Sequence, residues 1–183
     1  MHLSAIAVGF FLSGAVPGYA GTATMHVKLD RETFPPKSLI TLQNLADRVA
    51  ATIDRLIPGR VTKSNQPEFL CYIAPDFWRG AAYDPPPITL IGAARLGEPK
   101  AARAGTVRIA LDSLVLPNHA ELVYELAHEL AHVKMDPRYD NYLVETLAVA
   151  ASLEALTVMG FEQARKMTLT ITRNNCLKVF KLL

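Results

Sequence analysis

The sequence predicts an α+β fold in which a small, mostly antiparallel sheet packs on helices. One segment near the start has apolar residues at helical spacing, three short apolar runs bounded by Pro or Gly follow, and two further helical segments occupy the last third of the chain. The chain has 183 residues, of which 50% are apolar and 20% charged, as in ordinary globular proteins. We therefore expect a single domain over residues 21–183, preceded by a leader over residues 1–20.

The leader is expected to be a secretory signal peptide. Residues 1–20 contain no Lys, Arg, Asp or Glu and run as an apolar stretch from Leu3 to Leu12, followed by small residues up to Ala20. This pattern is typical of a signal peptide that is cleaved after Ala20. The apolar stretch is shorter than the roughly 20 residues that a membrane-spanning helix needs. We expect export to the periplasm or the medium, with no stable membrane insertion once the signal peptide is removed.

Charge and cysteine content restrict the function only weakly. The formal net charge of +2 is too small, and the basic residues too scattered, to indicate a nucleic-acid partner. The two cysteines, Cys71 and Cys176, lie far apart in the sequence and form no C-x-x-C motif. An oxidising compartment allows one long-loop disulfide between them, and two unpaired buried thiols are the alternative. The oligomeric state is not predicted.

The first structural element after the leader is expected to be a core helix. It ends at Pro58-Gly59, where the sequence Pro-Gly breaks a helix. Its apolar residues follow the three-to-four spacing of an amphipathic helix: Leu42, Leu45, Val49, Ile53 and Leu56. We assign no chemistry to it.

The strands are expected in three short runs, residues 69–74, 88–91 and 106–111. In the last run Val107, Ile109 and Leu111 alternate with more polar residues, which is the pattern of a half-buried strand. These three runs should form the sheet, and the turn-rich stretches between them should be surface loops.

The last third of the chain predicts two consecutive helices. The first has Asn118 as its N-cap with Glu121 three residues later, and Pro137 prevents it from continuing. The second covers roughly residues 141–159, and Gly160 ends it. Residues 161–183 are expected to be helical and mildly basic.

The first of these helices carries the segment His128-Glu129-Leu130-Ala131-His132. A step of four residues on an α-helix rotates by about 40° and rises about 6 Å, so both imidazoles project from one face and can reach one metal ion. The alternative is that both histidines are ordinary core or surface residues. Leu130 and Ala131 favour the metal site, because a helix that lies behind a buried metal needs apolar residues there.

This segment resembles the H-E-x-x-H helix of the zinc metallopeptidases known as zincins. The resemblance implies a zincin-like fold and the hydrolysis of peptide bonds in a peptide or protein substrate. It implies one Zn²⁺ per chain held by His128 and His132, a metal-activated water, and Glu129 as the general base. Two flanking residues depart from the extended family pattern, since Glu125 and Lys134 stand where small or apolar residues are usual.

The resemblance to the glutamate-ligand branch of this superfamily, the gluzincins, implies a third zinc ligand on the second helix. Glu145 and Glu154 are available there. If the helices meet in a short turn, Glu145 lies level with His132, whereas Glu154 overshoots it by about 13 Å. Glu145 is therefore the expected ligand, although the twelve residues between His132 and Glu145 are fewer than is usual in that branch.

Other residues near the two helices are candidates for metal binding or for the contact between the helices. Asp136 and Asp140 are competing metal ligands in the turn. Close approach of the helices is favoured by the small residues Ala148, Ala150 and Ala151.

Zincins also use an oxyanion stabiliser and an edge strand that pairs with extended substrate. The candidates for the stabiliser are Arg138, Tyr139 and Tyr142, and residues 105–112 occupy the position of the edge strand in the order of elements. Two other functions stay open: an exported protein that binds metal without turnover, and a structural interaction protein.

Overall fold

The computed structural model describes residues 25–58, 68–79, 86–93, 95–102, 107–135 and 141–170. The predicted signal peptide, Cys176 and residues 171–183 lie outside these ranges. The described elements are β1 (His26–Leu29), α1 (Pro36–Leu56), β2 (Glu68–Ile73), the 3₁₀ turn η1 (Asp76–Arg79), β3 (Ile88–Leu90), β4 (Arg108–Leu111), the 3₁₀ turn η2 (Ser113–Val115), α2 (His119–Met135) and α3 (Tyr142–Val158). A fourth helical segment covers residues 162–170. The fold is α+β, as predicted.

The sheet is mixed, so the prediction of a mostly antiparallel sheet is wrong. Its four strands lie in the order β1-β2-β4-β3. The pairs β1/β2 and β2/β4 are parallel, and only β3/β4 is antiparallel. One reason is the strand β1, which the sequence interpretation missed, and the other is that β2 pairs with β4 and not with β3, the strand that follows it in the chain. Helix α1 connects β1 to β2 as a crossover, and a crossover returns the chain to the same end of the sheet and makes the two strands parallel.

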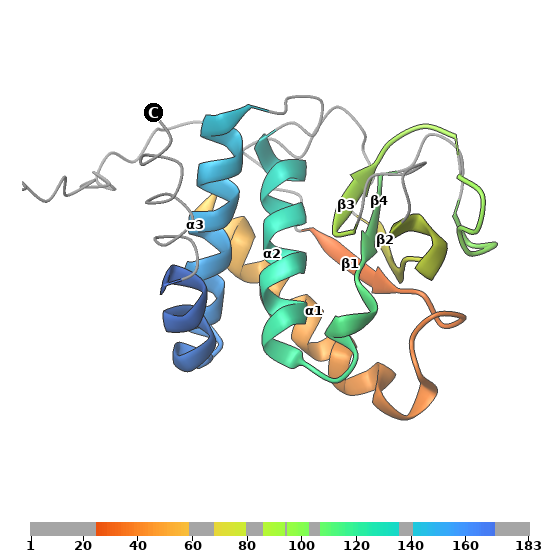
Figure 1. Cartoon of the computed structure of the whole chain (residues 1–183), viewed down its shortest axis with the longest axis horizontal. Helices are drawn as coiled ribbons and strands as arrows, with labels where there is room; N and C mark the ends of the chain where they lie inside the picture. The colour runs from red at the N-terminus through yellow and green to blue at the C-terminus, as the bar shows by residue number, and fades with distance from the viewer. Residues whose placement is uncertain are drawn as a thin grey trace, which may run out of the picture.

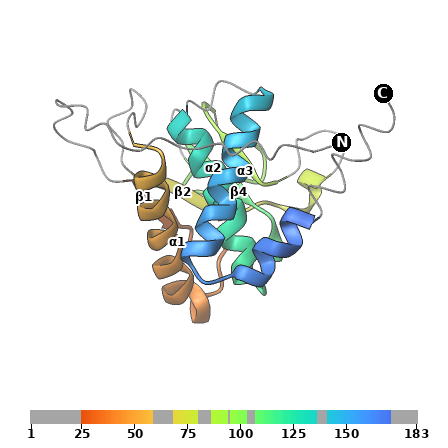
Figure 2. The ribbon, with the colours of Figure 1, turned by 90° about the vertical axis from the view of Figure 1, so that its left-hand side faces the viewer.

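The helices form two layers on one side of the sheet. Helices α1 and α2 pack against the strands, and α3 packs on α2 and α1 (Figures 1 and 2). In Figure 1 α2 stands between α3 and the sheet. Helix α2 therefore contacts the strands on one side and α3 on the other, so it lies at the centre of the domain.

Alternating residues of the inner strands supply two cores. Phe69 and Cys71 of β2 and Ile109 of β4 face the helices and join the larger core. Tyr72 and Ala110 face the other way and form a smaller core with three further residues, Ala74, Trp78 and Leu90. The period of two residues that defines a strand therefore buries both faces of the sheet.

Helix α1 confirms the predicted amphipathic pattern. Four of the five residues predicted for its apolar face are buried: Leu42, Leu45, Val49 and Ile53. The fifth, Leu56, lies in the last turn and is 38% exposed. The helix begins at Pro36, a position where the missing N–H of proline costs no hydrogen bond.

Strand β4 is buried on both faces, although it contains an arginine. Arg108 is fully buried. Its Nε donates to Oε2 of Glu98 at 2.8 Å, and its other nitrogens donate to the carbonyl oxygens of Gly92 and Ala93. The guanidinium therefore holds the segment that follows β3 against the sheet.

The two edges of the sheet differ. At β1 the side chain of Gln43 on α1 accepts a hydrogen bond from Leu29 N at 3.0 Å and donates one to Val27 O at 2.6 Å. This edge is therefore closed by a helix side chain. Strand β3 forms the opposite edge, and β4 lies inside the sheet. The expectation that residues 105–112 form the edge strand is wrong, since β4 has a strand on each side.

Candidate metal centre

Helices α2 and α3 begin at caps that fix their starting points. Oδ1 of Asn118 accepts hydrogen bonds from Ala120 N and Glu121 N, so the predicted N-cap is confirmed. At the start of α3, Oδ1 of Asn141 accepts from Leu143 N and Val144 N at 3.1 Å each. An asparagine at this position satisfies N–H groups that have no partner within the helix.

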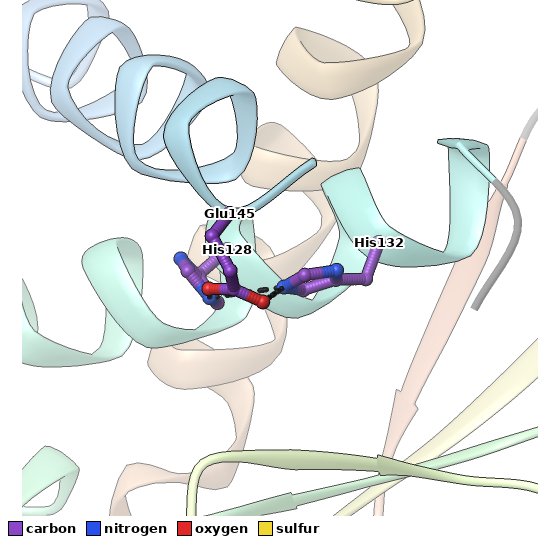
Figure 3. Close-up of side chains that lie close together, drawn as sticks. All are labelled: His128, His132 and Glu145. Carbon is purple, nitrogen blue, oxygen red and sulfur yellow. Dashed lines mark hydrogen bonds and ion pairs between the residues drawn. The ribbon is translucent and has the colours of Figure 1, made fainter. Parts of the chain in front are cut away.

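His128, His132 and Glu145 converge at one point between the two helices (Figure 3). The two Nε2 atoms of the histidines lie 3.1 Å apart. Oε2 of Glu145 lies 3.3 Å from His128 Nε2, and Oε1 lies 3.0 Å from His132 Nε2. Glu145 comes from the first turn of α3, and both histidines come from one face of α2. Three residues that the sequence singled out therefore lie together.

The donor set and its spacing fit a small divalent cation. A tetrahedral zinc ion with bonds of about 2.0–2.1 Å keeps its ligand atoms about 3.3 Å apart, close to the separations found here. Two imidazole nitrogens and a carboxylate oxygen are also common zinc ligands. The Glu145 side chain is 45% exposed, whereas the side chains of His128 and His132 are 15% and 12% exposed. The group is thus open to solvent on the side of Glu145, and it could hold a metal ion.

The surroundings of His128 favour the neutral imidazole that binds metals. Burial lowers the pKa of His128, and the neighbouring His132 lowers it further, while Glu145 acts in the opposite direction. The ring of Tyr124, one helical turn earlier, stacks on His128 at a centroid distance of 6.4 Å. His128 Nδ1 is buried and has no hydrogen-bond partner within the described part of the chain.

Glu129 lies beside this group and points at the sheet. Its carboxylate is 4% exposed, and its Oε2 accepts a hydrogen bond from the hydroxyl of Thr89 on β3 at 2.7 Å. Burial raises the pKa of Glu129 to about 7, and the hydrogen bonds from the Thr89 hydroxyl and backbone N–H oppose the rise. Glu129 is not among the three residues that could hold the ion. It is therefore a buried carboxyl that can both gain and lose a proton near neutral pH.

The two departures from the family pattern have structural roles. Glu125 is 4% exposed and accepts a hydrogen bond from Asp112 N, just after β4, at 2.9 Å. Lys134 is 6% exposed and pairs with Asp54 of α1, with 2.7 Å between Nζ and Oδ1. Asp54 also accepts from Met25 N at 2.8 Å. These two charged residues therefore attach α2 to the sheet and to α1.

The other residues that the sequence suggested for the site are either exposed on α3 or outside the described residues. Tyr142 is 85% exposed at the start of α3. Arg138, Tyr139, Asp136 and Asp140 lie outside the described residues. Glu154 is exposed, nine residues beyond Glu145 on α3.

Whether Cys71 and Cys176 form a disulfide cannot be followed, because Cys176 lies outside the described residues. Cys71 is buried in β2 and has no disulfide partner among the described residues. Burial raises its pKa, and the nearby carboxylates of Glu125 and Glu129 raise it further.

Two residues of the site were not found from the sequence. Tyr124 stands four residues before His128, so the same helical spacing that links the histidines could have found it. Thr89 gave no sequence signal, because its contact with Glu129 spans 40 residues. Only the packing of α2 against β3 reveals it.

Comparisons with protein-family models, with curated proteins and with solved structures each gave no match. Within the described ranges, none of the helices has both the length and the apolar character to cross a membrane.

Proposed function

We propose that this chain is an exported zinc-dependent peptidase with a zincin-like fold. The observation that carries the proposal is the convergence of His128, His132 and Glu145, from two helices, beside the buried Glu129. On α2 two histidines stand four residues apart, with a glutamate directly after the first. The H-E-x-x-H motif of zincins has this arrangement. The position of β3 adds support, because this antiparallel edge strand lies next to α2 and contacts Glu129.

In this proposal each residue has a separate task. His128, His132 and Glu145 would hold the zinc. When bound, the ion supplies Lewis acidity that polarises a peptide carbonyl and lowers the pKa of a water molecule towards about 7. Glu129 would accept a proton from the attacking water and later give it to the leaving amine. Its burial suits this task, since a base works best when its pKa lies near the working pH.

The outer edge of β3 would bind the substrate. An extended peptide can add to an exposed strand through main-chain hydrogen bonds, which tolerates many side chains. The peptide bond to be cleaved would then lie between β3 and the three ligands. The substrate is therefore proposed to be an extended segment of a peptide or protein.

The first experiment measures zinc in the full chain by atomic emission, after reconstitution and removal of excess metal. We expect close to one zinc per chain, and loss of that zinc in His132→Ala and Glu145→Ala. The matched controls are His119→Ala at the exposed start of α2 and Glu154→Ala on the exposed face of α3, which should keep it. Failure of the unmodified chain to retain zinc would refute the metal site.

The second experiment tests for catalysis with a library of quenched fluorescent peptides. The zinc-loaded chain should cleave members of the library, and Glu129→Gln should retain zinc but lose at least about 100-fold in rate, the usual contribution of a general base. Equal rates for the two proteins would refute the role of Glu129. Zinc binding without any hydrolysis would favour a metal-binding protein without turnover.

A further inference from the structure

Thr89 occupies the middle of the edge strand β3 and contacts Glu129. Its hydroxyl donates to Glu129 Oε2 at 2.7 Å. A glutamate side chain has three rotatable bonds, and without fixed partners it samples many orientations. A short hydrogen bond from a residue of the sheet restricts that choice.

The strand that carries Thr89 is held firmly. Thr89 is opposite Ile109 in the antiparallel pair of β3 with β4. Directly after β3, the carbonyl oxygens of Gly92 and Ala93 accept hydrogen bonds from the fully buried Arg108. The strand is therefore fixed along its length and just beyond its end, so Thr89 provides a fixed point for the carboxylate.

We propose that Thr89 is a positioning residue that fixes the orientation of the Glu129 carboxylate during peptide hydrolysis. This inference rests on the proposed peptidase function. A general base must lie within hydrogen-bond reach of the proton it accepts. A misplacement of about 1 Å can reduce a rate by about 100-fold. A hydrogen bond that holds the Glu129 carboxylate in place should therefore preserve the rate of hydrolysis. Loss of the anchor should lower turnover more than substrate binding.

The kinetic test compares Thr89→Val with Thr89→Ser in the full, zinc-loaded chain. Valine has the shape of threonine without the hydroxyl, whereas serine keeps the hydroxyl. For Thr89→Val we expect kcat to fall about 10-fold to 100-fold, the range for one hydrogen bond to a charged group. KM should change less than about twofold in the same assay, because Thr89 acts through Glu129 and not on the substrate. Thr89→Ser should restore most of kcat.

The matched control is Thr157→Val on α3. The Thr157 hydroxyl donates to the carbonyl oxygen of Leu153 at 3.1 Å, so the same chemical change removes a hydrogen bond outside the proposed site. This variant should keep kcat. Zinc content should stay close to the original in Thr89→Val, and the midpoint of thermal unfolding should fall only by the amount that the loss of one hydrogen bond explains.

A second readout requires no activity. Equilibrium unfolding in urea of Thr89→Val, Glu129→Ala and the double variant gives the coupling between the two side chains. We expect the effect of the double variant on the unfolding constant to differ by at least about threefold from the product of the single effects. Additive effects would show that the contact is absent in solution and would overturn the inference.

The remaining outcomes separate this inference from the proposed function. Full kcat in Thr89→Val, with an active unmodified chain, overturns the positioning role alone. Loss of zinc or of folding in both Thr89 variants shows a purely structural role and also overturns it. An unmodified chain that binds zinc but cleaves no peptide refutes the peptidase function, and the positioning role with it.

Discussion

Glu125 is the residue whose charge should most affect how stability depends on pH. It is buried and faces Asp112, Glu121 and Glu129, and burial raises its pKa to about 7 from an ordinary value of 4.5. The folded state therefore favours the neutral carboxyl. Its stabilising contribution is complete below about pH 4.5 and is lost as the pH rises through about 7. The cost of the ionised form above that range is at most roughly 3 kcal/mol.

We predict that Glu125→Gln will stabilise the zinc-free chain at pH 8 but hardly at pH 5. The amide stays neutral, and its oxygen can still accept the hydrogen bond from Asp112 N. The gain at pH 8 should reach about 1–3 kcal/mol in urea unfolding with a chelator present. Glu154→Gln, at an exposed position, is the control and should show no such difference. Equal effects of Glu125→Gln at both pH values would contradict the prediction.

At the scale of single residues, the sequence predicted which side chains meet between α2 and α3 but not which polar residues are buried. The ligand face of α2 follows from a spacing of four residues, so His128 and His132 could be paired without a structure. Arg108 was taken as part of the polar face of a strand, yet it is fully buried and paired with Glu98. Residue type alone cannot reveal this buried ion pair, because it depends on how the connection between β3 and β4 folds back onto the sheet.

The contact between α2 and α3 depends on small residues at particular positions. Ala148 is fully buried and Ala151 is 7% exposed, whereas Ala150 is exposed. Two of the three alanines that the sequence suggested for this contact are therefore buried. Ala148 follows Glu145 by three residues, so it lies near Glu145 on the same side of α3.

We predict that Ala148→Leu will weaken zinc binding. The larger side chain should push α3 away from α2 and move Glu145 away from the histidines. Overpacking of this kind usually costs about 1–3 kcal/mol, which corresponds to a loss in zinc affinity of about 5-fold to 150-fold. Competition with a fluorescent zinc chelator measures the change. Ala150→Leu adds the same group at an exposed position, and an equal loss in that variant would contradict the explanation.

At the scale of elements, periodicity predicted the helices more reliably than the sheet. The bounds of α2 and α3 agree with the predicted caps to within about a turn. Strand β1 was missed because its four residues are too short for a convincing pattern, although His26 and Lys28 are exposed while Val27 and Leu29 are buried. Strand order depends on contacts between distant segments, which local periodicity does not contain. The edge strand was assigned wrongly for the same reason.

For the whole molecule, a bound zinc ion would join helices α2 and α3. Ligands from α2 and α3 meet at one point, so an ion there would bind the folded chain more tightly than the unfolded chain. The metal should then add to the stability of the whole domain, because α2 lies between the sheet and α3.

We predict that removing zinc with a chelator will lower the midpoint of thermal unfolding by about 8–16 °C. A ligand present at about 1,000 times its Kd stabilises the fold by about 4 kcal/mol, and each kcal/mol corresponds to about 2–4 °C in a chain of this size. Differential scanning calorimetry with and without added zinc tests this. Glu145→Ala should lack the shift. A shift of equal size in that variant would mean that zinc stabilises the chain at another place.

The unequal edges of the sheet also affect self-association. Within the described residues no strand pairs with the outer side of β3, whereas Gln43 already pairs with Val27 and Leu29 at the opposite edge. Growth of a fibre by edge-to-edge pairing requires every unit to offer two open edges. A molecule with one closed edge can end such a chain of strands but cannot extend it. In the described part of the chain, the sheet therefore has one edge at which a strand could add, too few for edge-to-edge growth.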